Sequence, residues 1–114
     1  MTNDLKIYDR AEALARLDGD EALFAEMAGM FVGECDAYCD ALNGALAAQD
    51  PVQLRREAHT VKSLLATFSF ESGRLLALQL EQLAAGGSLD GAEALTRDLI
   101  AATRQLAAAL SADA

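Results

Sequence analysis

The sequence predicts an all-α protein, an antiparallel up-down-up-down bundle of four long helices preceded by a short N-terminal helix. Three observations support this fold class. Apolar side chains recur at steps of three and four residues along most of the chain, which is the period of an α-helix. Alanine and leucine are abundant, tryptophan is absent and proline occurs once, a composition that favours helix. Asp, Pro and Gly residues separate the periodic stretches by short connections.

The capping residues indicate where each helix begins and ends. Five helices are expected, over about residues 10–17, 21–48, 51–67, 71–85 and 91–110. Three pairs have the spacing of a capping box, namely Asp9 with Glu12, Asp50 with Gln53 and Asp90 with Glu93. Pro51 suits a first helical position, where no amide hydrogen is needed. Asp18-Gly19 and Gly86-Gly87 are the expected stops.

Apolar residues at helical spacing predict the inner face of each helix. The expected inner positions are Leu14 and Leu17; Phe24, Met27, Phe31, Cys35, Tyr38, Leu42 and Leu46; Leu54, Ala58, Val61, Leu65 and Phe68; Leu76, Leu80 and Leu83, flanked by Leu75 and Leu78; and Leu95, Leu99, Leu106 and Leu110. Gly29 and Gly33, four residues apart, are interpreted as a close helix crossing. The first helix should lie across one end as a lid, after the apolar lead-in 5–8, and residues 111–114 should fray.

Length and charge limit the class of protein. The 114 residues suit one domain, 1–114, with its bundle core at about 20–110. The net charge of −9 repels nucleic acid and anionic membranes, and neither is expected as a partner. No apolar run is long enough to cross a membrane and no secretory signal is recognised, so we expect a cytoplasmic monomer. Cys35 and Cys39 are interpreted as buried or half-buried thiols in a reducing compartment.

The only histidine, His59, lies in the middle of the third long stretch, residues 51–67. At about 100° per residue, it projects away from the apolar stripe of its helix and towards solvent. Lys62 and Ser63 share that outer face. Arg55, Arg56 and Lys62 make this segment locally positive in a chain with 9 basic and 18 acidic residues. A lone solvent-exposed imidazole surrounded by cations suits a group that carries or meets an anion.

The stretch Ala58-His59-Thr60-Val61-Lys62-Ser63, continuing to Ser69, resembles the signature of histidine-containing phosphotransfer (HPt) domains. That signature reads roughly A-H-x-[LV]-K-G-x-x-x-x-[LIF]-G, and the following helix ends in Leu-Glu, here Leu80-Glu81. The resemblance covers about residues 7–110. Ser63 and Ser69 stand where the family usually has glycines, and both replacements are small.

The resemblance implies a role for each residue around the histidine. His59 would accept the phosphoryl group, and Glu81 would hydrogen-bond its imidazole, leaving Nε2 as the nucleophile if the bond is to Nδ1. Lys62 would neutralise charge on the transferring oxygens, with help from Arg55 and Arg56. Ser63, Arg55, Arg56 and Ala66 would meet the partner. The implied partners are receiver domains of a hybrid histidine kinase and of a response regulator, which also supply the Mg²⁺ ion; the chain itself needs no cofactor or metal.

The sequence contains no nucleotide-binding loop, so the chain is expected to be a phosphocarrier and not a kinase. Two other classes remain open. A non-catalytic HPt-like adaptor would dock a receiver or kinase without carrying phosphate. The two departures at Ser63 and Ser69 support it, and the retained His59 and Lys62 argue against it. A bundle that binds haem or a metal is disfavoured, because one histidine facing away from the core is a poor ligand set.

Overall fold

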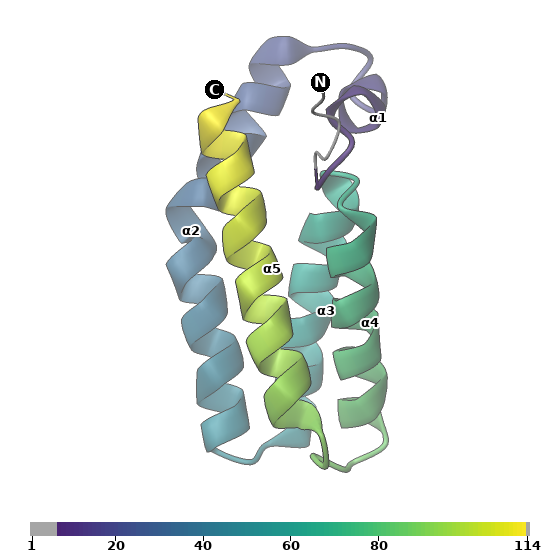
Figure 1. Ribbon diagram of the computed structural model, residues 1–114, viewed down its shortest axis with the longest axis vertical. Helices are drawn as coiled ribbons and strands as arrows, with labels where there is room; N and C mark the ends of the chain where they lie inside the picture. The colour runs from purple at the N-terminus through teal and green to yellow at the C-terminus, as the bar shows by residue number, and fades with distance from the viewer. Residues whose placement is uncertain (1–6, 114) are drawn as a thin grey trace.

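The structure, a computed structural model, describes residues 7–113 (Figure 1). Its helices are α1 (Arg10–Ala15), α2 (Glu21–Ala47), α3 (Pro51–Thr67), α4 (Glu71–Ala85) and α5 (Ala92–Ala112). The predicted all-helical fold is confirmed for this part of the chain. Leu5 and Lys6, half of the expected apolar lead-in, lie outside the described residues, as does Ala114.

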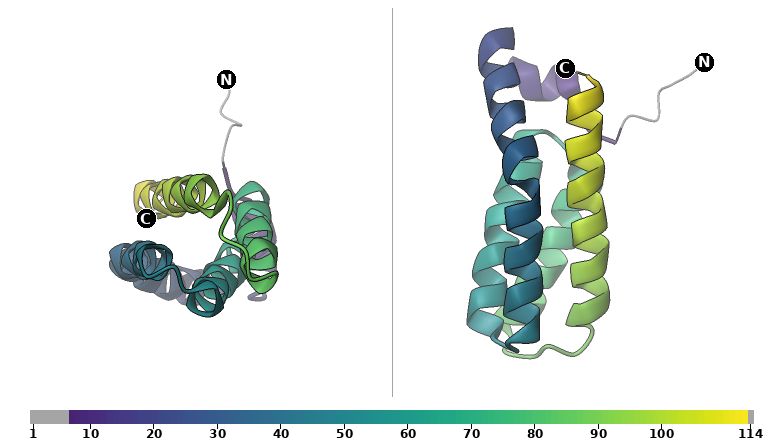
Figure 2. Two further views of the ribbon diagram at one scale, coloured as in Figure 1. Left: turned by 90° about the horizontal axis from the view of Figure 1, so that it is seen from below. Right: turned by 90° about the vertical axis from the view of Figure 1, so that its left-hand side faces the viewer.

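The four longer helices lie side by side around one core (Figure 2). Helix α3 packs against α2 and α4, and α5 packs against the same two helices from the other side. Helix α1 lies across the end of the bundle at which α3 ends, as the sequence predicts for a lid (Figures 1 and 2). The α3–α4 pair, which carries the histidine signature and Glu81, is therefore held by helices on both sides.

The core confirms most of the predicted inner faces. All five residues of the α3 stripe are buried, and so are Phe24, Phe31, Cys35 and Leu42 of α2. Helix α4 differs from the prediction. Its buried line is Gly73, Ala77, Leu80 and Ala84, while Leu76, Leu78 and Leu83 are half-buried and Leu75 is exposed. Small residues occupy this line because α3 lies against it.

The helix ends confirm two of the predicted N-caps and correct a third. Asp9 and Asp50 each accept a hydrogen bond from the amide three residues on, although Glu12 and Gln53 do not return one. Helix α5 instead begins after Gly91, whose φ of 83° places it in the left-handed region that favours glycine, so Asp90 is not the cap. The same helix continues through Ser111 and Ala112, which the sequence predicted to fray.

The close approach between helices occurs at Gly73 and not at Gly29 or Gly33, so that prediction is wrong. A Cβ atom added to Gly29 or Gly33 would meet nothing within 4 Å. At Gly73 it would lie 2.8 Å from the Phe70 ring and 2.9 Å from a methyl group of Leu65, both of which are buried. Gly73 thus sets how closely α4 approaches α3.

Gly73→Ala is expected to destabilise the bundle by about 1–3 kcal/mol, because the added methyl group overpacks a filled core. Gly33→Ala is the matched control. It should stabilise by up to about 1 kcal/mol, since alanine is the better helix former and the space is open. Urea unfolding of the two variants measures both effects, and a stabilising Gly73→Ala would contradict the close packing described above.

The two cysteines are free thiols buried between α2 and α5, as the sequence predicted. The Sγ atom of Cys35 lies 3.9 Å from the carbonyl oxygen of Thr103 on α5. Burial raises the pKa of the Cys39 thiol to about 11, so little reactive thiolate forms at neutral pH. Both thiols therefore act as core side chains.

Candidate functional site

Helix α3 presents His59 to solvent because its opposite face is buried. Asp50 and Pro51 fix the start of the helix, and Leu54, Ala58 and Val61 turn inwards within its first three turns. The His59 side chain is consequently 60% exposed. Such exposure leaves room for a partner to approach the imidazole.

Glu81 of α4 joins His59 and Lys62 of α3 in one cluster. Its Oε2 atom lies 2.8 Å from Nδ1 of His59, and its Oε1 atom lies 2.6 Å from Nζ of Lys62. The Glu81 side chain is 18% exposed and that of Lys62 is 23% exposed, so this ion pair is largely shielded. Helical spacing placed His59 and Lys62 on one face, the resemblance placed Glu81 beside His59, and the ion pair between Glu81 and Lys62 was not predicted.

The charge on Glu81 decides which nitrogen of His59 is free. Partial burial acts to raise the pKa of the Glu81 carboxyl, but the Lys62 ammonium and the His59 ring outweigh it, and the pKa lies below its ordinary value. Glu81 is therefore ionised at neutral pH and can only accept hydrogen bonds. Nδ1 of His59 must carry the proton, which leaves the Nε2 lone pair free on the solvent side.

A shallow hollow of about 330 Å³ surrounds the imidazole. Arg55, Arg56, His59 and Thr60 of α3 line it, together with Glu81 of α4. Thr60 was not predicted as part of the site. Its hydroxyl donates to the carbonyl oxygen of Arg56 at 3.1 Å, and nothing in its sequence position distinguishes it from a surface threonine.

The other two predicted contact residues, Ser63 and Ala66, lie further along α3. Ser63 is exposed, and its hydroxyl donates to the carbonyl oxygen of His59 at 3.2 Å. The side chain is thus folded back on its own helix, which explains how serine fits where the family usually has glycine. Ala66 is half-buried, and neither residue lines the hollow around the imidazole.

Arg16, which the sequence analysis did not single out, closes the end of α3. Its guanidinium donates to the carbonyl oxygens of Ala66 at 3.1 Å and Thr67 at 2.9 Å, and to the hydroxyl of Ser69. The last turn of α3 contains no basic residue, so Arg16 supplies the cation that a helix C-terminus favours. Ser69 has a φ of 56°, which explains why the family usually has glycine there. No sequence signal relates Arg16 to residues 66–69, which lie 50 to 53 positions later in the chain.

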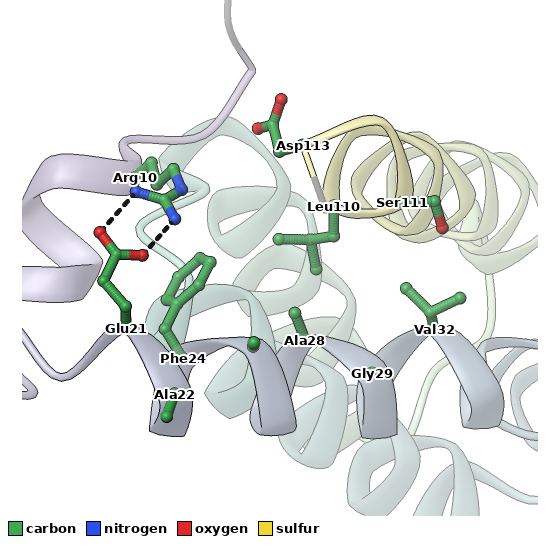
Figure 3. A pocket seen from close by; sticks show the side chains of 11 residues that line it. Arg10, Glu21, Ala22, Phe24, Ala28, Gly29, Val32, Leu110, Ser111 and Asp113 are labelled. Atoms are coloured by element: carbon green, nitrogen blue, oxygen red, sulfur yellow. Dashed lines mark hydrogen bonds and ion pairs between the residues drawn. The ribbon is translucent and has the colours of Figure 1, made fainter.

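A larger hollow, of about 490 Å³, lies at the end of the bundle near the C-terminus (Figure 3). Apolar side chains of α2 and Leu110 of α5 form most of it. Its one cation, Arg10, is paired with Glu21 at 2.6 Å. The residues that line this hollow include no histidine or cysteine, so we assign the chemistry to the smaller one around His59.

The described residues contain neither a helix suited to span a membrane nor a cluster suited to bind a metal ion. None of the helices within residues 7–113 combines the length and apolarity needed to cross a membrane. Within the same residues, no group of three or more His, Cys, Asp or Glu side chains is arranged to hold a metal ion.

Comparison with known proteins identifies the family. The model of the Hpt domain matches residues 26–113, which is most of the chain and includes all seven predicted site residues. Comparisons with curated proteins and with solved structures returned no match. Hpt domains are phosphocarrier modules and not kinases, and they interact with receiver domains and kinases. The chain therefore belongs to the Hpt domain family, whose members perform histidine phosphotransfer in two-component phosphorelays.

Proposed function

We propose that this chain relays a phosphoryl group between the aspartates of two receiver domains through Nε2 of His59. One receiver would belong to a hybrid histidine kinase and the other to a response regulator. The contact that carries the proposal is the 2.8 Å bond between Glu81 and Nδ1, because it directs the free lone pair of an exposed imidazole outwards. The short connections favour an up-down-up-down order for the four long helices, which would keep α3 and α4 adjacent.

The transfer step balances without any further reactant. The Nε2 lone pair attacks phosphorus and forms a P–N bond, while the P–O bond of the aspartyl phosphate breaks and its electron pair stays on the aspartate. The Nδ1 proton remains on the ring, so the phosphorylated imidazole is cationic. The ionised Glu81 stabilises this positive charge, and the reverse reaction returns the phosphoryl group to an aspartate.

The partner is proposed to complete the site. Its receiver domain would bring the Mg²⁺ ion that neutralises the phosphoryl oxygens during transfer, so that the chain needs no cofactor of its own. Ser63, Arg55, Arg56 and Ala66 would meet the receiver on the exposed side of α3. We also propose that the chain acts as a monomer in the cytoplasm.

Incubation with a panel of phosphorylated receiver domains tests the proposal. Radiolabel should move to this chain and be lost in acid but kept in alkali, as a phosphoramidate is. Label that stays on every receiver while the proteins still bind each other would instead support the adaptor function. Absence of both transfer and binding would contradict both functions.

Lys62→Ala should slow transfer roughly tenfold, because a positioned cation beside the transferring group is lost. The same substitution should raise the pKa of Glu81, since burial would then be opposed only by His59. Rapid-quench kinetics measures the first effect, and carbon-13 NMR titration of the carboxyl group measures the second. Arg104→Ala, which removes an exposed cation paired with Asp36, is the control and should change neither.

A further inference from the structure

The ion pairs leave two cations of the described chain unneutralised. Residues 7–113 contain eight basic side chains, and six of them lie within 4 Å of a carboxylate oxygen. The paired residues are Arg10, Arg16, Lys62, Arg74, Arg97 and Arg104. Arg55 and Arg56 have no such partner, although acidic residues outnumber basic ones twofold in the whole chain. Both line the hollow around His59.

Local contacts explain why these two arginines stay free. Their nearest acid in the sequence, Glu57, is hydrogen-bonded to the amide of Gln53 on its own helix. The only carboxylate that lines the hollow, Glu81, is bound to His59 and Lys62. Arg55 and Arg56 are the i−4 and i−3 neighbours of His59 on α3, and all three side chains line the same hollow. A group bound to Nε2 would lie among two free guanidinium groups.

We propose that Arg55 and Arg56 bind the oxygens of the phosphoryl group once it is on His59, and so stabilise the phosphorylated form of this chain. The inference rests on the proposed function and deepens it. Lys62 shares its charge with Glu81 at 2.6 Å, so it neutralises the dianion only in part and further cations are needed. Guanidinium groups suit it, because their paired N–H donors match the geometry of phosphate oxygens.

This role differs measurably from docking of the receiver. A residue that only attracts the partner changes how fast phosphate moves but not the final distribution between the two proteins. A residue that binds the phosphoryl group itself shifts that distribution towards phosphohistidine and lowers the pKa of the phosphoryl group. Arg55 and Arg56 are expected to shift the distribution towards phosphohistidine and to lower the pKa of the phosphoryl group.

The first experiment needs no partner. His59 is phosphorylated with phosphoramidate, and the phosphorus-31 shift is followed against pH in the parent and in Arg55→Gln, Arg56→Gln and the double variant. The titration midpoint should rise in each single variant and rise further in the double variant. Arg97→Gln removes the same charge from α5, outside the hollow, and should match the parent.

The second experiment measures the equilibrium between a phosphorylated receiver and this chain. Each arginine lost should move it roughly threefold towards the receiver, the size expected for an exposed charge-assisted contact. Unchanged midpoints and an unchanged equilibrium in the double variant would overturn the inference and leave the arginines as docking residues. If the parent protein accepts no phosphoryl group from any phosphorylated receiver, both the proposed function and this inference are contradicted.

Discussion

Substitution of His59 by glutamine is expected to abolish phosphorylation of this chain completely. No other imidazole exists in the sequence, and Nε2 is the ring nitrogen that the bond between Nδ1 and Glu81 leaves available. Glutamine retains an amide N–H group that can still donate to Glu81, so the contact between α3 and α4 is conserved. Because the side chain is 60% exposed, no core packing is lost. Transfer from a phosphorylated receiver, followed by radiolabel, measures the effect.

The fold of this variant has to be checked in the same preparation. Far-ultraviolet circular dichroism and the urea midpoint should match those of the parent, because the substitution touches no buried residue. Label that survives His59→Gln with the same lability in acid would disprove the relay through this residue. An unfolded variant would show that the imidazole contributes more to stability than its exposure indicates.

Ser63→Arg is expected to block transfer, although it adds a cation beside a site that handles an anion. Ser63 is exposed one turn beyond His59, on the face where a receiver has to come close. In-line attack requires the phosphorus atom to approach Nε2 to about 3–3.5 Å, and a long side chain between the proteins prevents that approach. Its steric effect should therefore exceed its electrostatic attraction. Transfer rates at saturating receiver concentration measure the outcome.

Ser63→Gly is the matched control for the steric argument. The serine hydroxyl bonds to the His59 carbonyl of its own helix, so its loss breaks no contact between helices. Transfer should stay the same or become faster, with a small loss of helix stability from the glycine. Equal rates for Ser63→Arg and the parent would show that the receiver docks on another face, and would refute the docking surface proposed above.

Sequence periodicity and capping residues correctly predicted the features of α3 that depend on residues a few positions apart. The α3 stripe from Leu54 to Phe68 is buried as expected, and Asp50 with Pro51 opens that helix, because burial of a stripe and capping of a first turn depend on residues a few positions apart. The exposure of His59 follows from the same stripe. The pairing of His59 with Glu81 came only from the resemblance, since nothing local relates residues on different helices, and the pairing of Lys62 with Glu81 was not predicted.

The wrong predictions concern contacts between helices and backbone conformation. Gly29 and Gly33 have the spacing of a crossing, but no neighbouring helix approaches them, while the single Gly73 meets Leu65 and Phe70. Spacing along one helix does not reveal which neighbour it meets. Asp90 has the chemistry of an N-cap, yet the left-handed Gly91 starts α5 one residue later. Glycine adopts left-handed and helical backbone conformations about equally readily. The sequence around Gly91 therefore did not show whether that residue is the cap or the first residue of the helix.

The contacts of residues 8–24 show that the folding unit is longer than the segment that matches the family. The match begins at residue 26, whereas Arg16 closes the end of α3 and Phe24 packs edge-on against Phe68 at 5.9 Å between ring centroids. Tyr8 and Ala13 are buried as well. A fragment cut at the boundary of the match would keep every residue assigned to the chemistry. It would nevertheless lose Tyr8, Ala13 and Phe24, which are part of the hydrophobic core, and with Phe24 the ring that packs against Phe68 at the end of α3.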